Sequence, residues 1–345
     1  EADMHLGDGT DAELVCAVFH VACHAVDSLG APVGNASLRF VLPGTSVDVA
    51  ATTGYDGNCS VRLPVGSYAL TAMWMNTIVN RTDGLPVDAD ASLDIACAVY
   101  YLDLALQDSA GAGLEGAAVR LTSHTAGVFE AVSGPDGSVS FIVPMSIFHT
   151  KTYWWGVTVN ATEIAVASNS HAVLNCSVYY PHVKPLDSRS IILEGATVNV
   201  YAGEEVVASG VCGGDGWTAR APAGTWRFEV RWQGVVVADS SFDVDGSDEI
   251  PVECSVSYLT VKAMDSGGRA QDGVEIGVFA SNGASLGSAE TVNGQAEFRL
   301  PDQTVTVKGR LSREYMMTHI DLRVESQATV NGDVEVETGG VAHAT

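Results

Sequence analysis

The chain has 345 residues, 46% of them hydrophobic, which is enough for several domains and too apolar for a disordered polymer. Its net charge is −25, which excludes nucleic acid and anionic membrane surfaces as partners. No apolar run approaches the roughly 20 residues of a membrane span, so we expect no membrane insertion. The chain starts at Glu1 and not at Met, which we interpret as removal of a secretory signal peptide, and this predicts an extracellular or cell-surface location.

The first segment looks like the end of a repeat. Residues 1–15 form a tail, and residues 9–18, GTDAELVCAV, resemble two later segments that close repeats. These are DADASLDIACAV at 88–99 and SDEIPVECSV at 247–256. The chain therefore opens with a closing strand whose own repeat is missing.

A strand without a partner exposes backbone donors and acceptors, and joining the sheet of another molecule can satisfy them. We expect residues 9–20 to pair with the fourth repeat of a neighbouring subunit, whose closing strand, ATVNGDVEVE, is weak and would leave that sandwich poorly closed. The residues on one face of the donated strand define the predicted polymer interface: Leu14, Cys16 and Val18. The alternatives are a mobile tail and the trimmed end of a longer chain.

Four repeats follow, at residues 16–97, 98–176, 177–254 and 255–345. Each opens with a strand that ends in Asp-Ser, and about 30 residues later each has an Asp-Gly or Asn-Gly pair between alternating runs, a strong hairpin signal. Cysteines recur at the junctions with spacings of 81, 79 and 78 residues: Cys16, Cys97, Cys176 and Cys254. This period predicts an all-β fold of four tandem Greek-key β-sandwich domains.

Period-2 alternation assigns the faces of the first strands. The side chains expected to point inward in repeats 1 and 2 are Val21, Cys23, Ala25, Leu102, Leu104 and Leu106.

The motif order resembles that of carboxypeptidase regulatory-like repeats, which are prealbumin-like or immunoglobulin-like sandwiches. It runs from Asp-x-x-Gly through Asp-Gly and Leu-Pro-x-Gly-x-Tyr to Trp. The Trp before a Gly-Val run, as in WWGVTVN and RWQGVVV, is similar to tandem repeats of archaeal cell-surface proteins. The resemblance covers nearly the whole chain and implies the fold. It does not specify a function, because such modules serve as stalks, adhesins, filament subunits and accessory domains. Repeat 4 departs from the pattern, with Arg310 in place of the Trp.

No catalytic motif is present, so we do not expect an enzyme. Residues 111–116, GAGLEG, match a dinucleotide motif in form, but the equivalent segments of other repeats are plain strand connections. Two acidic loops occupy matching positions, one with Asp88 and Asp90 and one at 243–249. Their oxygen ligands could hold calcium, but we interpret both as solvated loops. We therefore assign no cofactor and no metal ligand.

Seven cysteines in a secreted chain imply disulfides with one cysteine left over. Cys23 and Cys59 both fall on inward positions and occur together in repeat 1 alone. We predict a disulfide between them across the first core; the alternative is two buried free thiols.

Five Asn-x-Ser/Thr sequons lie in the first half of the chain: Asn35, Asn58, Asn80, Asn160 and Asn175. Asn80 and Asn160 each come six residues after a repeated tryptophan, Trp74 or Trp154. We expect a turn to expose them there and predict glycans if the source organism glycosylates; coincidence in polar turns is the alternative. The tryptophans themselves could stack on sugars, but packing is the commoner role.

These features predict a structural subunit of an extracellular filament, sheath or surface layer. Identical subunits would polymerise head to tail, because such contacts form filaments when they do not close into a ring. The alternatives are an adhesin stalk or glycan-binding module, and the accessory region of a larger surface enzyme.

Overall fold

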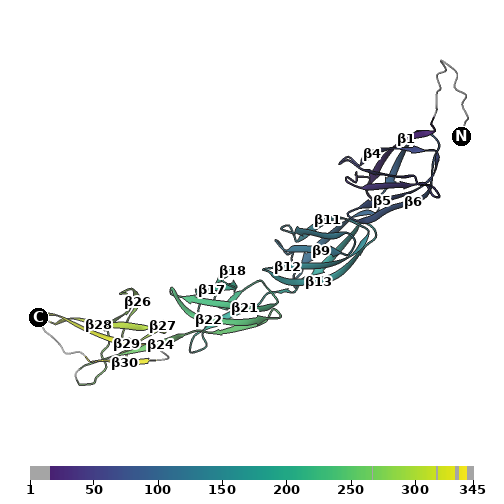
Figure 1. The fold of residues 1–345 in the computed structure, drawn as a ribbon. Coiled ribbons are helices and arrows are strands. Elements are labelled where there is room, and N and C mark those ends of the chain that lie inside the picture. The colour runs from purple at the N-terminus through teal and green to yellow at the C-terminus, as the bar shows by residue number, and fades with distance from the viewer. Residues whose placement is uncertain (1–15, 266, 316–317, 331–333, 340–345) are drawn as a thin grey trace, which may run out of the picture. The chain divides into compact units, whose positions relative to one another are not determined.

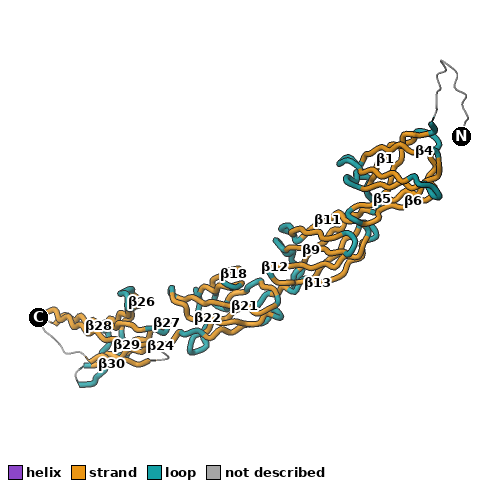
Figure 2. The backbone as a smooth tube through the Cα atoms, viewed as in Figure 1, coloured by secondary structure: helices purple, strands orange, loops and turns teal. Residues whose placement is uncertain are grey.

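The structure is a computed structural model that describes residues 16–265, 267–315, 318–330 and 334–339. These residues form strands and turns without any helix, as Figure 2 shows in orange and teal. None of the described segments is therefore a helix long and apolar enough to span a bilayer. The predicted all-β fold of tandem sandwiches is confirmed. The chain divides into two units, Glu1–Ser177 and Val178–Thr345, and each unit holds two repeats.

Repeat 1 has a three-stranded sheet in the order β4-β1-β7 and a four-stranded sheet in the order β3-β2-β5-β6. Figure 1 labels β1 and β4 of the first sheet and β5 and β6 of the second. β1 is antiparallel to β4 and parallel to β7. One core contains side chains of both sheets, and Val21, Cys23 and Ala25 are buried in it as predicted. The strands are β1 (Val18–Val26), β2 (Ser37–Val41), β3 (Asp48–Thr52), β4 (Asn58–Pro64), β5 (Gly66–Trp74), β6 (Thr77–Val87) and β7 (Ala91–Ala96).

Repeat 2 repeats this topology with the sheets β11-β8-β14 and β10-β9-β12-β13. Its predicted inward residues, Leu102, Leu104 and Leu106, are all buried. The strands are β8 (Val99–Gln107), β9 (Ala118–Ser123), β10 (Gly127–Val132), β11 (Ser138–Pro144), β12 (Ser146–Trp154), β13 (Val157–Val166) and β14 (Ser170–Asn175).

Repeat 3 has the sheets β19-β16-β23 and β18-β17-β21-β22 and a small pair, β15-β20. Its first strand is split into β15 and β16 around Pro181, which cannot donate a backbone hydrogen bond. The strands are β15 (Val178–Tyr179), β16 (His182–Leu186), β17 (Thr197–Ala202), β18 (Glu205–Val211), β19 (Trp217–Thr218), β20 (Ala221–Pro222), β21 (Gly224–Trp232), β22 (Val235–Val244) and β23 (Glu249–Glu253).

Repeat 4 has the sheets β27-β24-β30 and β26-β25-β28-β29. β30 pairs with β24 from Leu259↔Val334 to Met264↔Gly339, so the expectation of a poorly closed sandwich is wrong. The alternating residues of β30 join the sheet although polar residues precede them in the sequence. The strands are β24 (Val256–Met264), β25 (Glu275–Ala280), β26 (Ser285–Glu290), β27 (Gln295–Pro301), β28 (Thr304–Tyr315), β29 (Thr318–Thr329) and β30 (Val334–Gly339).

The Asp-Gly pairs are turns, but they do not join hairpins. The turn at Gly57 links β3 of one sheet to β4 of the other, so the hairpin prediction is wrong at this point. Gly57 has a φ of 74°, and a Cβ there would lie 2.6 Å from the carbonyl oxygen of Ala25 on β1. The glycine is needed because the crossing turn lies directly against the first strand, where Ala25 N donates to Gly57 O at 2.9 Å.

Candidate functional site: the repeat junctions

Each first strand is followed directly by an aspartate that folds the next residues into a turn. Asp27 Oδ1 accepts hydrogen bonds from the backbone N–H groups of Leu29 (2.8 Å) and Ala31 (2.9 Å). The same pair of bonds, at positions two and four residues ahead, is made by the other three aspartates: Asp108, Asp187 and Asp265. This turn uses Oδ1 and leaves Oδ2 for a second partner.

In the first unit, that second partner comes from the following repeat. Tyr101 on β8 donates its hydroxyl to Asp27 Oδ2 at 2.9 Å, and Ser28 N donates to Val99 O at 3.1 Å. The bond to the Asp27 carboxylate raises the pKa of Tyr101, with burial adding to it. Val99 is 1% exposed and belongs to the core of repeat 1. Asn169 Oδ1 accepts from both Ser28 Oγ (2.7 Å) and Tyr101 N (3.0 Å). Repeats 1 and 2 are thus joined by a buried valine and a hydrogen-bond network.

The junction in the second unit has the same arrangement. Tyr258 on β24 donates its hydroxyl to Asp187 Oδ2 at 2.8 Å, and Ser188 N donates to Val256 O at 2.9 Å. Val256 is fully buried.

Two arginines reinforce this second junction. Arg299 Nε lies 2.7 Å from Asp187 Oδ2, and the Asp187 side chain has no exposed surface. The Arg189 guanidinium covers the Tyr258 ring at 3.5 Å and donates two hydrogen bonds to Glu297. Burial acts to raise the pKa of Asp187. The hydrogen bonds it accepts, two from the turn and one from Tyr258, and the Arg299 charge outweigh burial and hold that pKa below its ordinary value.

The junction cysteines are buried thiols. Cys97, Cys176 and Cys254 are each at most 8% exposed, and each Sγ donates to the carbonyl oxygen two residues earlier. Burial raises the pKa to about 11 for Cys97 and Cys176 and to about 12 for Cys254. They therefore serve as small apolar side chains at the junctions, protonated at neutral pH.

The predicted polymer interface is only partly described. Leu14 lies outside the described residues, while Cys16 and Val18 are exposed. Val18 begins β1 and pairs with Pro64 of the same repeat. One edge of residues 18–20 is therefore already hydrogen-bonded to β4, so a neighbour could pair only with the other edge. Pairing with a neighbour stays a prediction.

Cys23 and Cys59 stand directly opposite each other on β1 and β4. They belong to one sheet, so the expectation that they face each other across the core is wrong. Both are free thiols in the structure. Directly opposed residues have Cα atoms about 4.5–5.5 Å apart, which is within the range of a disulfide. Burial first, and the nearby Cys59 second, raise the pKa of Cys23 to about 12. The disulfide stays a prediction.

The two equivalent sequons do not lie in turns. Asn80 and Asn160 are half-buried within β6 and β13, and their Nδ2 groups donate to Ala96 O and Asn175 O, both at 2.8 Å. The expectation of a turn is wrong because the turn comes earlier, at residues 75–76 in repeat 1. Both amides instead tie a strand to the end of the closing strand. The remaining sequons are exposed: Asn35, Asn58 and Asn175.

The repeated tryptophans contact the turn before the second strand. Trp74 Nε1 donates to Gly34 O and Trp154 Nε1 to Glu115 O, both at 3.2 Å. In the acidic loops, Asp90 Oδ1 accepts from His20 N at 2.7 Å. Throughout the described part of the chain, no three His, Cys, Asp or Glu side chains are grouped so that they could hold a metal ion.

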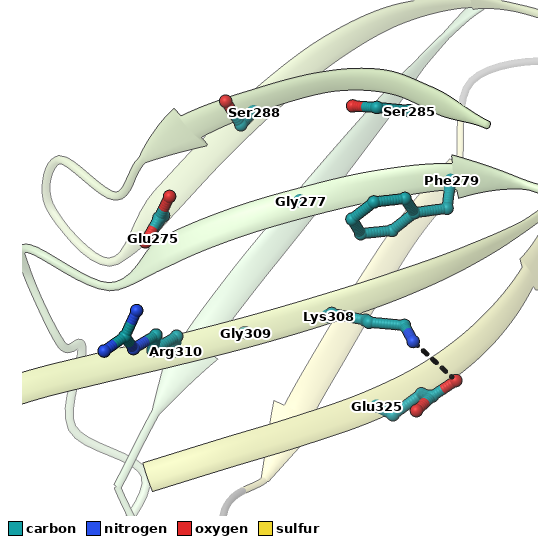
Figure 3. Close-up of a pocket in the computed structure, with 9 residues that line it drawn as sticks. All are labelled: Glu275, Gly277, Phe279, Ser285, Ser288, Lys308, Gly309, Arg310 and Glu325. Atoms are coloured by element: carbon teal, nitrogen blue, oxygen red, sulfur yellow. Dashed lines mark ion pairs between the residues drawn. The ribbon is translucent and has the colours of Figure 1, made fainter. Parts of the chain in front are cut away.

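Repeat 4 has a hollow on the outer face of its four-stranded sheet, with a volume of about 670 Å³ (Figure 3). Gly277 has no side chain on this face, which leaves the centre of the hollow low beside the Phe279 ring. Phe279 and Lys308 lie at one end, where Lys308 Nζ is 3.5 Å from Glu325 Oε1. The remaining lining residues are Glu275, Ser285, Ser288 and Arg310. An aromatic ring beside charged groups of both signs suits a polar ligand.

The aspartate–tyrosine contacts were missed by sequence reasoning. A signal existed, since a tyrosine follows each internal junction cysteine by four residues: Tyr101, Tyr180 and Tyr258.

No family model and no curated relative matches the sequence. Among solved structures, the Bacillus anthracis TIE protein is similar at 12% identity, over 96% of this chain and 76% of that chain, with a TM-score of 0.25. The streptococcal ancillary pilin is similar at 11% identity, over 69% of this chain and 99% of that chain, with a TM-score of 0.26. The major pilin subunit BcpA of Bacillus cereus is similar at 10% identity, over 94% of this chain and 100% of that chain, with a TM-score of 0.22. Similarities of this size carry no argument about function.

Proposed function

We propose that the protein is a non-enzymatic structural subunit of an extracellular filament, sheath or surface layer, assembled head to tail from identical chains. The observation that carries this proposal is the repeat junction. In each unit, one sandwich is joined to the next by a buried valine and an aspartate–tyrosine hydrogen bond, in addition to the peptide linker. Joints of this kind suit a module that forms linear arrays, where each repeat contacts only its neighbours.

In its finer form, the proposal has residues 9–20 of one subunit join the sheet of repeat 4 in the next. β30 already occupies the closing position beside β24, so a donated strand would either displace β30 or add to its outer edge. Such a strand would contribute roughly 0.5–1.5 kcal/mol for each backbone hydrogen bond.

Two preparations test the subunit role and strand donation: the full chain and a chain that lacks residues 1–15. Polymers of the full chain, seen by sedimentation and negative-stain microscopy, would support the subunit role, and a full chain that stays monomeric at high concentration would contradict it. If the shortened chain still polymerises in the same form, strand donation is wrong.

A second candidate function is glycan or ligand binding by an adhesin-type module, and the hollow of repeat 4 favours it. Its test is calorimetric titration with a panel of soluble oligosaccharides. Phe279→Ala should weaken any binding at least ten-fold, whereas Tyr55→Ala, at an aromatic residue that is 91% exposed in repeat 1, should not change it. Equal binding by both variants would exclude the hollow as the site.

A further inference from the structure

The start of repeat 1 has the backbone of an internal linker. Between repeats 1 and 2, Val99 N donates to Cys97 O at 2.8 Å, and at the start of the described chain Val18 N donates to Cys16 O at 2.9 Å. A second bond holds the middle residue of each linker: Val65 N to Ala17 O at 3.0 Å, and Met145 N to Ala98 O at 2.9 Å. Residues 16–18 are therefore preformed as a linker.

The side chains of this linker differ from the internal ones in exposure. Val99 is 1% exposed and Val256 0%, whereas the equivalent Val18 is 45% exposed. Cys16 is likewise exposed, whereas Cys97 is buried. Val18 thus has the backbone conformation of the buried junction valines, while its side chain faces solvent.

His20 occupies the position of the junction tyrosine. Its backbone N–H donates to Asp90 Oδ1 at 2.7 Å, just as Tyr101 N donates to Asn169 Oδ1 at 3.0 Å from the same loop of repeat 2. Tyr101 uses its hydroxyl to reach Asp27 in the repeat before it. The exposed imidazole of His20 also carries an N–H donor, so it can serve a carboxylate in the same way.

Asp265 is a carboxylate prepared for such a donor. Its Oδ1 accepts from Gly267 N and Arg269 N, both at 2.9 Å, in the same turn that precedes each junction. Within the described residues, its Oδ2 has only a long contact with Gln271 Nε2, at 3.5 Å. Asp265 is half-buried, whereas Asp187, which the next repeat covers, is 6% exposed.

The end of repeat 4 is also more polar than the corresponding ends of repeats 1 to 3. Gln271 N donates to Ala263 O at 2.9 Å, which places Gln271 at the position that repeats 1 to 3 fill with an apolar residue. Those residues are Val33, Leu114 and Leu193, all at most 4% exposed. A polar side chain tolerates water before docking, which suits a joint between separate chains better than one within a chain.

We propose that Val18 and His20 of one chain dock on the Asp265 turn of a second copy, with His20 donating to Asp265 Oδ2 and Val18 covering the end of repeat 4. This rests on the proposed head-to-tail polymer and names its two surfaces. The joint reproduces the internal junctions and leaves β30 in place, so it is a second route to the same polymer, distinct from strand donation.

The test compares matched single variants of the full chain by sedimentation velocity. Val18→Asp and Asp265→Asn should each weaken association at least ten-fold; the asparagine keeps an oxygen for the turn, and circular dichroism checks the fold. The controls are Val128→Asp, at a valine that is 50% exposed in repeat 2, and Asp83→Asn, which removes an equal charge from β6. Both controls should assemble like the unaltered chain.

Mixing separates head-to-tail docking from other modes. Val18→Asp retains a working Asp265 turn, and Asp265→Asn retains a working N-terminal edge, so an equimolar mixture should form two-chain species and no longer polymers. His20→Tyr, which restores the internal donor, should strengthen association.

The outcomes distinguish the two proposals. If the unaltered chain polymerises and neither variant weakens it, the docking inference is wrong and the subunit role stands. If the unaltered chain is monomeric, the subunit role fails and the inference fails with it. A chain that lacks residues 1–15 keeps Val18 and His20, so it should still polymerise; loss of polymers would overturn the docking route in favour of strand donation.

Discussion

Replacing Tyr258 with phenylalanine removes one hydroxyl from the junction of the second unit and keeps the ring that Arg189 covers. The side chain of Asp187 has no exposed surface, so water cannot easily replace the lost donor, and Arg299 is left as the partner of Oδ2. A hydrogen bond to a charged group contributes about 1.5–3 kcal/mol. The remaining arginine argues for the lower half of this range.

The amide of Ser188 reports on this joint directly, because it donates to Val256 O in the next repeat at 2.9 Å. When the joint opens, this amide exchanges its proton with solvent. A loss in this lower half, about 1.5–2.3 kcal/mol, corresponds to roughly 10- to 50-fold faster exchange of Ser188 at neutral pH. Amide exchange followed at residue resolution measures it.

Tyr201→Phe is the matched control, because the Tyr201 hydroxyl makes only a 3.4 Å contact with Glu229 in the sheet of repeat 3. It should leave the Ser188 rate unchanged. Equal exchange at Ser188 in the unaltered chain and in Tyr258→Phe would show that the hydroxyl does not hold the joint.

Three further predictions follow from the same structure. Because the pKa of Asp187 is lowered in the folded state, its ionised form stabilises the junction above the ordinary aspartate pKa near 4. This stabilisation is lost as the pH falls through the lower pKa of the folded state. Amide exchange at the junction, corrected for intrinsic rates, should therefore accelerate only in that acid range. Gly57→Ala should lower the temperature of the calorimetric unfolding transition by more than about 8 °C, because it combines a left-handed φ with a backbone clash. Gly30→Ala should lower it less. Gly30 has a φ of 83° and nothing within 4 Å, so the substitution costs only the conformational part, about 1–2 kcal/mol of stability. Non-reducing peptide mapping of the native protein should recover Cys23 linked to Cys59, and recovery of both as free thiols would reject the disulfide.

Much of the fold could be predicted because period-2 alternation records which face of a strand is buried. The inward positions of β1 and β8 follow from this pattern alone. The error at Gly57 has a physical cause: an Asp-Gly pair specifies a tight turn, but not which sheet the next strand joins. In a sandwich, a chain that turns against β1 can cross to the other sheet, and here it does.

The candidate site was harder to predict, because a repeat pattern aligns residues with their copies and not with their partners. Asp27 and Tyr101 are 74 positions apart, and neither is unusual within its own repeat. The sequons also show that alignment with a copy in another repeat does not predict the surroundings of a residue. Asn80 and Asn160 are correctly aligned as equivalents, but their exposure depends on where the preceding turn ends, and two residues suffice for that turn.

The aspartate turn explains how one residue can serve both the repeat and the joint. Its Oδ1 is occupied by backbone donors within the same repeat, at 2.8–2.9 Å in repeat 1, so the carboxylate is fixed before any neighbour arrives. Its Oδ2 is then held in one orientation, and a donor from the next repeat binds without having to order it. Asparagine would form the turn but could offer an amide nitrogen to the second position, which cannot accept a hydrogen bond. Serine has no second oxygen. The joint therefore depends on aspartate in particular, and Asp265 presents the same fixed acceptor at the end of the last repeat.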